Sequence, residues 1–273
     1  MRPFVSAEAS QVKLAIFTAT RWEYQAVLKA LTVDLTTTMA GVRCTVGHRG
    51  RAKVSVFQSG IGPQKAKVTA QSVLGLDSWD FVVSSGFAGA LVPCSVGTIV
   101  VGDEVVVEEL TVSTDFVEQT PIVCHDIIRT QAWQVASSID HGSQSGRIVC
   151  LPRIVGTGAE KKALAARTHA VALDMESVSL GSVAHSQQIP FIVVRTISDV
   201  FDEDLPIDFN LFLSPGDWMK GVSMIVRNPS SLIQIFQLRQ QMLEASRTLS
   251  WFFQNFFDEI EQVHDSPKLA STR

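Results

Sequence analysis

The sequence has few charges and no strong field of either sign. Only 18% of its 273 residues are charged, the formal net charge is −4, and the isoelectric point is near 5.9. Lysine and arginine are scattered along the chain, so they form no basic face that would gather a polyanion. We therefore expect no nucleic-acid partner.

Metal, disulfide and serine-hydrolase patterns are also missing. The four cysteines form no CxxC pair and have no histidine at ligand spacing. The GxSxG motif of serine hydrolases does not occur. The sequence therefore predicts reduced, buried thiols, no metal site and no Ser-His-Asp triad.

No long apolar run is present. The N-terminus has no apolar segment of a secretory signal, and the longest uncharged stretches, 86–102 and 177–194, are interrupted by glycine, proline or polar residues. We expect a cytoplasmic protein without a membrane span. The mean hydropathy of +0.20 still indicates extensive buried surface, an oligomer interface or contact with lipid.

The first hundred residues alternate between strand and helix patterns. Apolar runs predict strands at 13–20, 52–58 and 80–84, the last of them ending in a glycine-bearing turn at 85–90. Helices are expected to begin near Arg21 and at Pro63. This alternation predicts an α/β fold, a three-layer sandwich with a central mixed β-sheet flanked by helices.

We predict a flexible leader over 1–12, one catalytic domain over 13–229 and a helical tail over 230–273. The apolar spacing of the tail indicates an amphipathic helix pair. Such a pair packs on the domain or on a partner subunit, and the aromatic and basic residues in it leave contact with a membrane surface as the alternative.

Two acids occupy positions where side chains reach a ligand. Glu176 lies at the expected start of a helix, and Asp199 follows the apolar strand run 191–197. In open α/β sheets, ligands bind beyond the carboxyl ends of strands. Each acid also has a simpler interpretation, since Asp199 could cap a helix or turn and Glu176 could favour a helix dipole.

Several segments in the same order resemble the nucleoside phosphorylases and nucleosidases, a family that includes methylthioadenosine/adenosylhomocysteine nucleosidase. The match spans about 14–205. Its pieces are Ala15–Leu31 with Glu23, Gln58–Gly62, Asp80–Gly89, Val96–Glu104, Asp174–Glu176 and Val194–Asp199.

The resemblance implies cleavage of an N-glycosidic bond to a purine. It assigns Asp199, oriented by Ser198, to protonation of N7 of the leaving base, and Glu176 to the ribose hydroxyls and the oxocarbenium-like transition state. Met175 then lies against the sugar, and Glu23 activates the attacking water. A structural interpretation of Glu23 is an exposed residue in the first turn of a helix.

The segment Phe87, Ala88 and Gly89 is expected beside the substrate, but it departs from the nucleosidases because they usually have a small polar residue at the position of Phe87. Ile154 and Val155 likewise occupy the segment that elsewhere presents an aromatic ring to the base. Contacts to the nucleophile and stacking on the purine therefore differ here.

The sequence leaves the nucleophile open between water and phosphate. The Gly-Asp-Pro-x-Arg phosphate loop of the larger phosphorylases is missing, and the acid at Glu23 favours hydrolysis. Phosphate remains the candidate co-substrate, with no other cofactor implied. The arginine side chains that could bind phosphate are those of Arg21, Arg43, Arg49, Arg51 and Arg195.

The segment Leu173–Ser177, the runs 195–206 and 208–213 and the apolar tail resemble the hopanoid-biosynthesis branch, whose members act on adenosylhopane. The expected function is release of adenine from a 5′-modified adenosine, with adenosylhopane as first candidate and methylthioadenosine or adenosylhomocysteine next. Alternatives are phosphorolysis of a purine nucleoside and a non-catalytic nucleoside- or lipid-binding protein. The resemblance also implies a homodimer.

Overall fold

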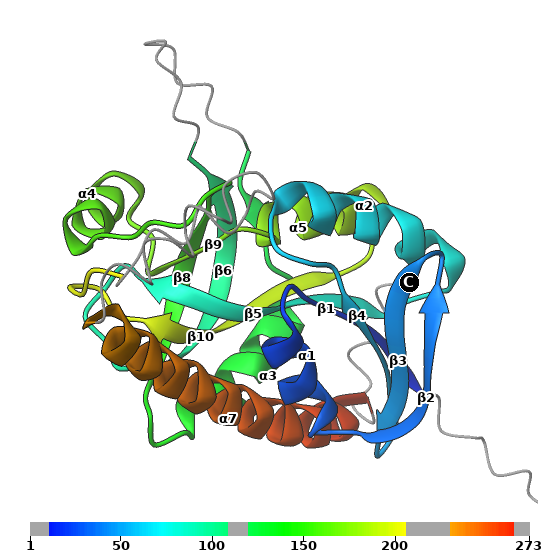
Figure 1. Cartoon of the computed structure of the whole chain (residues 1–273). Helices are drawn as coiled ribbons and strands as arrows, with labels where there is room; N and C mark the ends of the chain where they lie inside the picture. The colour runs from blue at the N-terminus through cyan, green and yellow to red at the C-terminus, as the bar shows by residue number, and fades with distance from the viewer. Residues whose placement is uncertain (1–10, 109–119, 206–229, 265–273) are drawn as a thin grey trace, which may run out of the picture.

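The computed structural model describes residues 11–108, 120–205 and 230–264 (Figure 1). The strands, in chain order, are β1 (Val12–Thr18), β2 (Thr32–Met39), β3 (Val42–Arg49), β4 (Ala52–Gln58), β5 (Phe81–Ala90), β6 (Ile99–Val107), β7 (Ile122–Val123), β8 (Ser143–Cys150), β9 (Ala172–Asp174) and β10 (Phe191–Asp199). The helices are α1 (Arg21–Leu28), α2 (Pro63–Val73), the short 3-10 helix η1 (Leu74–Leu76), α3 (Asp126–Ser137), α4 (Gly158–Thr168), α5 (Ser177–Ser186) and α7 (Ser230–His264). Val12 already belongs to β1, so the expected leader is too long by that residue, and residues 1–10 lie outside the described part.

The strands form one mixed sheet in the order β10-β6-β8-β9-β5-β1-β4-β3-β2, with β7 paired to β6. The strands β4, β1, β5 and β10 run parallel, whereas β2–β3, β3–β4, β5–β9 and β6–β10 are antiparallel pairs. An additional pairing of β10 with β5 closes β5, β9, β8, β6 and β10 into a ring. The predicted mixed sheet is therefore confirmed.

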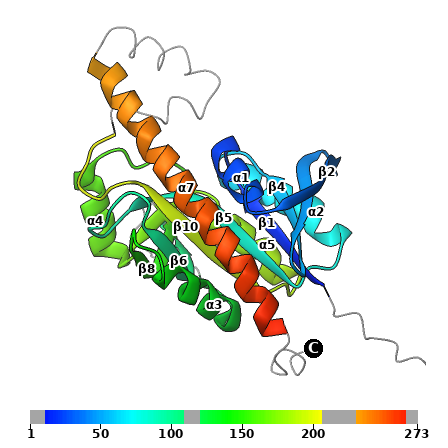
Figure 2. The ribbon, with the colours of Figure 1, turned by 90° about the horizontal axis from the view of Figure 1, so that it is seen from below.

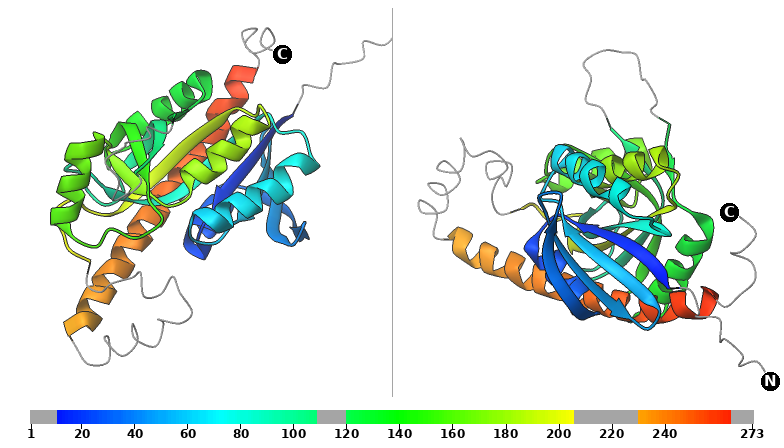
Figure 3. Two further views of the ribbon diagram at one scale, coloured as in Figure 1. Left: turned by 90° about the horizontal axis from the view of Figure 1, so that it is seen from above. Right: turned by 90° about the vertical axis from the view of Figure 1, so that its right-hand side faces the viewer.

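Helices cover the sheet on two sides. Helices α2 and α5 pack against each other on one side, where Figure 3 shows them next to one another from above. On the other side α7 crosses the molecule in Figure 2 and contacts α1, α3 and β10. This arrangement confirms the three-layer sandwich, and it explains the apolar composition because strands covered on both faces need apolar side chains on both.

Two expectations about elements are wrong, and one strand was not predicted. Residues 85–90 are not a turn: β5 continues to Ala90 because its last residues pair with both β9 and β10. Strand β2 has no predicted counterpart, since its side chains are almost all exposed and give no apolar alternation. The tail is one 35-residue helix, α7, and not a pair.

Four aromatic residues of α7 belong to the core. The side chains of Phe252, Phe253, Phe256 and Phe257 are fully buried and contact one another with ring centroids 5.2 to 6.3 Å apart. Packing on the core therefore accounts for this part of the apolar spacing. None of the described helices has the length and apolarity needed to cross a bilayer.

The cysteines are free thiols. Cys44, Cys124 and Cys150 are buried and Cys94 is half-buried, and burial raises the pKa of all four. The segment after Leu205 that resembles the hopanoid branch, 206–213, lies outside the described residues, as does the boundary predicted at residue 229.

Candidate active site

Asp199 is the last residue of β10, as the sequence predicts. Its carboxylate Oδ1 accepts a hydrogen bond from the ammonium Nζ of Lys161 on α4 at 2.8 Å. Burial raises the pKa of Asp199 from its ordinary value, and the ammonium group of Lys161 partly offsets this rise. The helix-cap interpretation does not apply, since the residues after Asp199 are not helical.

Glu176 precedes α5, as expected, but it provides no side-chain cap for that helix. Its Oε1 instead accepts a hydrogen bond of 2.7 Å from the backbone N–H of Gly62, the residue before α2. Burial, followed by the nearby carboxyl group of Asp174, raises the pKa of Glu176 to about 8. Glu176 is therefore a weak acid held between the starts of two helices.

Glu23 is buried, with 4% of its surface exposed, so the exposed first-turn interpretation is wrong. It forms a capping box with Thr20: its Oε2 accepts from the backbone N–H of Thr20 at 2.6 Å and of Ala19 at 3.0 Å, and Thr20 Oγ1 accepts from the Glu23 N–H. Its Oε1 accepts from the N–H of Phe87 on β5 at 2.8 Å. These bonds fix the carboxylate at the carboxyl end of β1.

Glu23, Phe87 and Glu176 line one small cavity of about 10 Å³. Residues of β1, β5, α5 and β10 also line it, among them Ser85 and Arg195. The hydroxyl group of Ser85 is buried and has no hydrogen-bond partner among the described residues. The cavity therefore offers a carboxylate and an unpaired hydroxyl group to one small polar molecule.

Arg195 does not provide a free cation to this cavity. Its guanidinium group is 2% exposed and binds Asp174, with Nε 2.9 Å from Oδ2. It also donates to the hydroxyl oxygens of Ser84 and Ser177, both at 2.7 Å. The expectation that Arg195 holds an anion is therefore wrong, since Asp174 neutralises its charge. Arg49 likewise forms an ion pair with Asp258.

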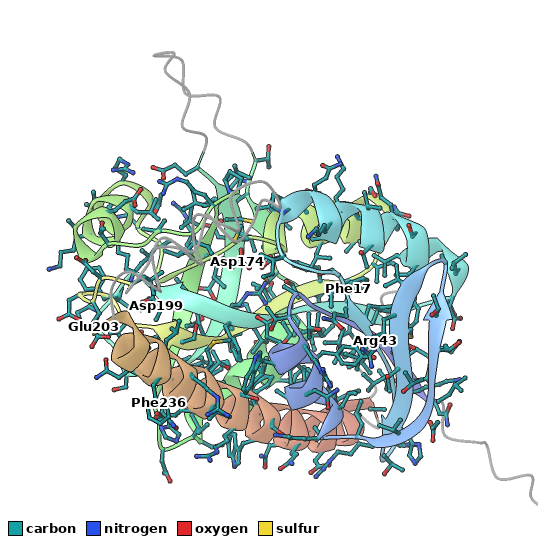
Figure 4. All side chains as sticks on the ribbon, viewed as in Figure 1. Phe17, Arg43, Asp174, Asp199, Glu203 and Phe236 are labelled. Carbon is teal, nitrogen blue, oxygen red and sulfur yellow. The ribbon has the colours of Figure 1, made fainter. Side chains whose placement is uncertain are left out.

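Asp199 borders a second, more open hollow of about 440 Å³, together with Glu203, Asp204 and the α7 residues Gln237 and Gln241. Figure 4 places Asp199 and Glu203 together and Asp174 between Asp199 and Phe17. Strand β5 connects the two places, since Gly89 pairs with Asp199 and Gly86 lies directly against Glu23. Three residues of strand span about 10 Å.

The other predicted residues take varied places. Met175 is buried after β9, and Ser198 lies at the irregularity near the end of β10. Ala88 pairs with Ile197 beside Gly89. Val155 is 1% exposed and packs in an apolar cluster with Leu151 and Leu164, so its side chain serves the core, while Ile154 beside it is half-buried. Their roles toward a substrate stay predictions.

The buried Lys161 and the pairing of Arg195 with Asp174 were missed in the sequence analysis. Nothing in the sequence of α4 separates Lys161 from Lys162, yet Lys161 is buried and Lys162 is exposed. Only the contacts of Lys161 with Asp199 and with the carbonyl oxygens of Val200 and Glu203 make the distinction. Within the described residues no group of three His, Cys, Asp or Glu side chains is arranged to hold a metal ion.

Known proteins resemble this chain in sequence and fold. The 5′-methylthioadenosine/S-adenosylhomocysteine nucleosidase of Shewanella loihica is 25% identical over 217 residues, covering 74% of this chain and 92% of that protein. The crystal structure of the Helicobacter pylori nucleosidase of the same name superimposes with a TM-score of 0.71 at 20% identity, covering 92% and 99% of the two chains. The futalosine hydrolase of Helicobacter pylori gives 0.70 at 21% identity, covering 91% and 98%. The model of the Phosphorylase superfamily matches residues 13–214, and the chain belongs to that superfamily.

Proposed function

We propose that this protein is an enzyme that cleaves the N-glycosidic bond of adenosine derivatives and releases adenine, with water as the nucleophile. The observation that carries the proposal is the set of three carboxyl groups in three different environments along β5. Glu23 is held by backbone N–H groups, Glu176 is desolvated, and Asp199 is paired with Lys161. Different environments are what allow carboxyl groups to perform different tasks at one pH.

The proposed reaction uses each group once. The bond between C1′ and N9 breaks with its electron pair leaving on the base, and Asp199 gives a proton to N7. Glu176 accepts hydrogen bonds from the ribose and, once ionised, stabilises the positive charge on the sugar. Glu23 takes a proton from the water molecule while the water oxygen forms a bond to C1′.

Water is favoured over phosphate by the size and charge of the cavity beside Glu23. Its volume of about 10 Å³ is close to that needed for a single water molecule. Glu23 and the free hydroxyl group of Ser85 are suitable hydrogen-bond partners for that water. A phosphate ion would meet two carboxyl groups there and a guanidinium group already neutralised by Asp174.

The 5′ substituent is proposed from resemblance alone, with adenosylhopane as one candidate and methylthioadenosine or adenosylhomocysteine as the others. The burial of the α7 phenylalanines gives the apolar composition a cause other than a lipid substrate. Homologues named for the sulfur-containing nucleosides make these two the first to test.

The test is incubation of the purified protein with 5′-methylthioadenosine, S-adenosylhomocysteine, adenosylhopane and inosine, each with and without phosphate. Free base is measured by chromatography. We expect the adenosine derivatives to release adenine in the absence of phosphate. An absolute phosphate requirement would establish phosphorolysis instead, and an absence of base release from every substrate would indicate a binding protein.

The Glu23→Gln variant checks the nucleophile assignment in the same assay. Glutamine keeps the side-chain length but cannot take a proton from water. We expect a fall in kcat of at least about a hundredfold, in line with typical general-base contributions. A rate within twofold of wild type would remove Glu23 from the mechanism.

A further inference from the structure

Lys161 is a lysine whose side chain has no contact with solvent. Its exposed fraction is 0%, and its ammonium group donates three hydrogen bonds. The acceptors are Asp199 Oδ1 at 2.8 Å, the carbonyl oxygen of Val200 at 2.6 Å and that of Glu203 at 3.1 Å. An ammonium group has three donors, so this one is fully satisfied.

The charge of Lys161 is directed at Asp199. A buried cation is tolerated only when it is paired, and Asp199 is the ion-pair partner of Lys161 in the described part of the chain. Among the described residues, the other charged groups near Asp199 are Glu203 and Asp204 from the loop after β10. Helix α7 faces the same hollow with uncharged glutamine side chains. Lys161 is thus the cation that opposes the surrounding acids.

The two carboxylate oxygens of Asp199 have different surroundings. Lys161 occupies Oδ1, whereas Oδ2 lies against Gly89 of β5, 3.4 Å from where a Cβ atom would stand on that residue. None of the described residues donates a hydrogen bond to Oδ2. Oδ2 is therefore the oxygen left for a ligand.

The loop that follows Asp199 is attached to α4 at several further points. The backbone N–H of Gly158 donates to Asp204 Oδ1 at 2.8 Å, and the N–H of Leu205 donates to the carbonyl oxygen of Gly156 at 2.7 Å. A Cβ atom on Gly158 would stand 3.0 Å from the backbone of Asp202. These contacts attach the start of α4 to the loop after β10. Lys161 lies between the helix and this loop, where it contacts Asp199, Val200 and Glu203.

We propose that Lys161 is a positioning residue for Asp199, binding Oδ1 so that Oδ2 is presented to the purine and keeping this carboxyl group acidic enough to release its proton. This inference rests on the proposed function. Burial alone would make Asp199 a poor proton donor, and the neighbouring Glu203 acts in the same direction. Burial and Glu203 both raise the pKa of Asp199, and the ammonium group of Lys161 lowers it.

The first test compares Lys161→Met with Lys162→Met, which makes the same change on an exposed neighbour whose ammonium group lies 5.8 Å from the ring centroid of Phe201. We expect Lys161→Met to lower kcat at least about tenfold with little change in KM. The basic limb of the kcat/KM profile should move up by about one pH unit or more, because loss of a nearby cation raises the pKa of Asp199. Lys162→Met should leave both unchanged. Equal profiles for the two variants would overturn the proposal.

The second test is independent of turnover. The Asp199 carboxyl group is titrated by carbon-13 NMR in wild type and in Lys161→Met, and we expect a higher pKa in the variant. If Lys161→Met does not fold, the stability of Asp199→Asn is instead compared with that of the double variant Asp199→Asn/Lys161→Met. The double variant should be at least as stable as Asp199→Asn, since it removes the unpaired cation.

The outcomes separate the two claims. Lack of base release by wild-type protein would reject the proposed function while the titration still decides whether Lys161 controls the acidity of Asp199. An unchanged Asp199 pKa, or a double variant less stable than Asp199→Asn, would overturn the role of Lys161 even in an active enzyme.

Discussion

At the scale of single residues, the site is defined by how each carboxyl group is held. Glu23 has both oxygens bound by backbone N–H groups, which fixes its orientation. Glu176 receives one backbone N–H and is otherwise desolvated. Asp199 depends on a lysine. A neutral substitution therefore has a different consequence at each position.

The Asp199→Asn variant is expected to lose activity and stability together. Its kcat should fall at least about a hundredfold, because asparagine cannot donate an acid proton to N7. The free energy of unfolding should fall by about 3 kcal/mol, because the buried ammonium group of Lys161 loses its counter-ion. Steady-state kinetics and urea unfolding measure the two effects.

The Asp77→Asn variant is the control for Asp199→Asn. It also removes the carboxylate of a lysine–aspartate ion pair, but this pair, between Lys13 and Asp77, is partly exposed. It should change stability by no more than about 1 kcal/mol and leave kcat unchanged. A wild-type rate in Asp199→Asn would exclude Asp199 from the chemistry.

At the scale of elements, β5 is the strand that organises the site. It pairs with β1, β9 and β10, so three of the segments that carry acids meet along it. Its second half is rich in small residues, and Gly86 shows why. A Cβ atom there would lie 2.6 Å from Glu23 Oε1. The close approach of strand and carboxylate requires glycine at this point.

The Gly86→Ala variant should displace the carboxylate of Glu23 while β5 stays intact. We expect kcat to fall by at least about tenfold, because a small misplacement of a catalytic group is costly. The matched control is Gly75→Ala, where a Cβ atom would meet nothing within 4 Å. Steady-state kinetics compare the two, and equal activity would show that Glu23 does not need its present position.

At the scale of the whole molecule, helices cover the mixed sheet on two sides, and of the site acids Glu23 is buried while Glu176 and Asp199 are half-buried. The raised pKa of Glu176 then links stability to pH. The folded protein keeps a proton on Glu176 that the unfolded chain has released above pH 4.5. Asp199, whose pKa is also raised, acts in the same direction.

The free energy of unfolding should consequently fall as pH rises from 4.5 to about 8, the window between the ordinary and the raised pKa of Glu176. The contribution of one such group is about 1.4 kcal/mol per pH unit inside the window. Urea unfolding at a series of pH values measures it in wild type and in Glu176→Gln. The variant should show a flatter dependence, and parallel curves would contradict the raised pKa.

The sequence by itself determined the class of fold and the order of the elements around the site. Alternating apolar and helical patterns are local properties, so β1, α1, α2 and β10 could be predicted close to their observed bounds. The positions of Glu176 before a helix and Asp199 at the end of a strand followed in the same way. Strand β2 and the second half of β5 could not be found, because pairing and not apolar alternation makes them strands.

Tertiary structure alone decided which charges meet. The Asp174–Arg195 pair is separated by 21 residues and the Lys161–Asp199 pair by 38. Lys161 of α4 is buried against Asp199 and the residues that follow β10, and no local sequence pattern contains these contacts. Burial and the charged partner then set the acidity of each carboxyl group, and so its chemical task.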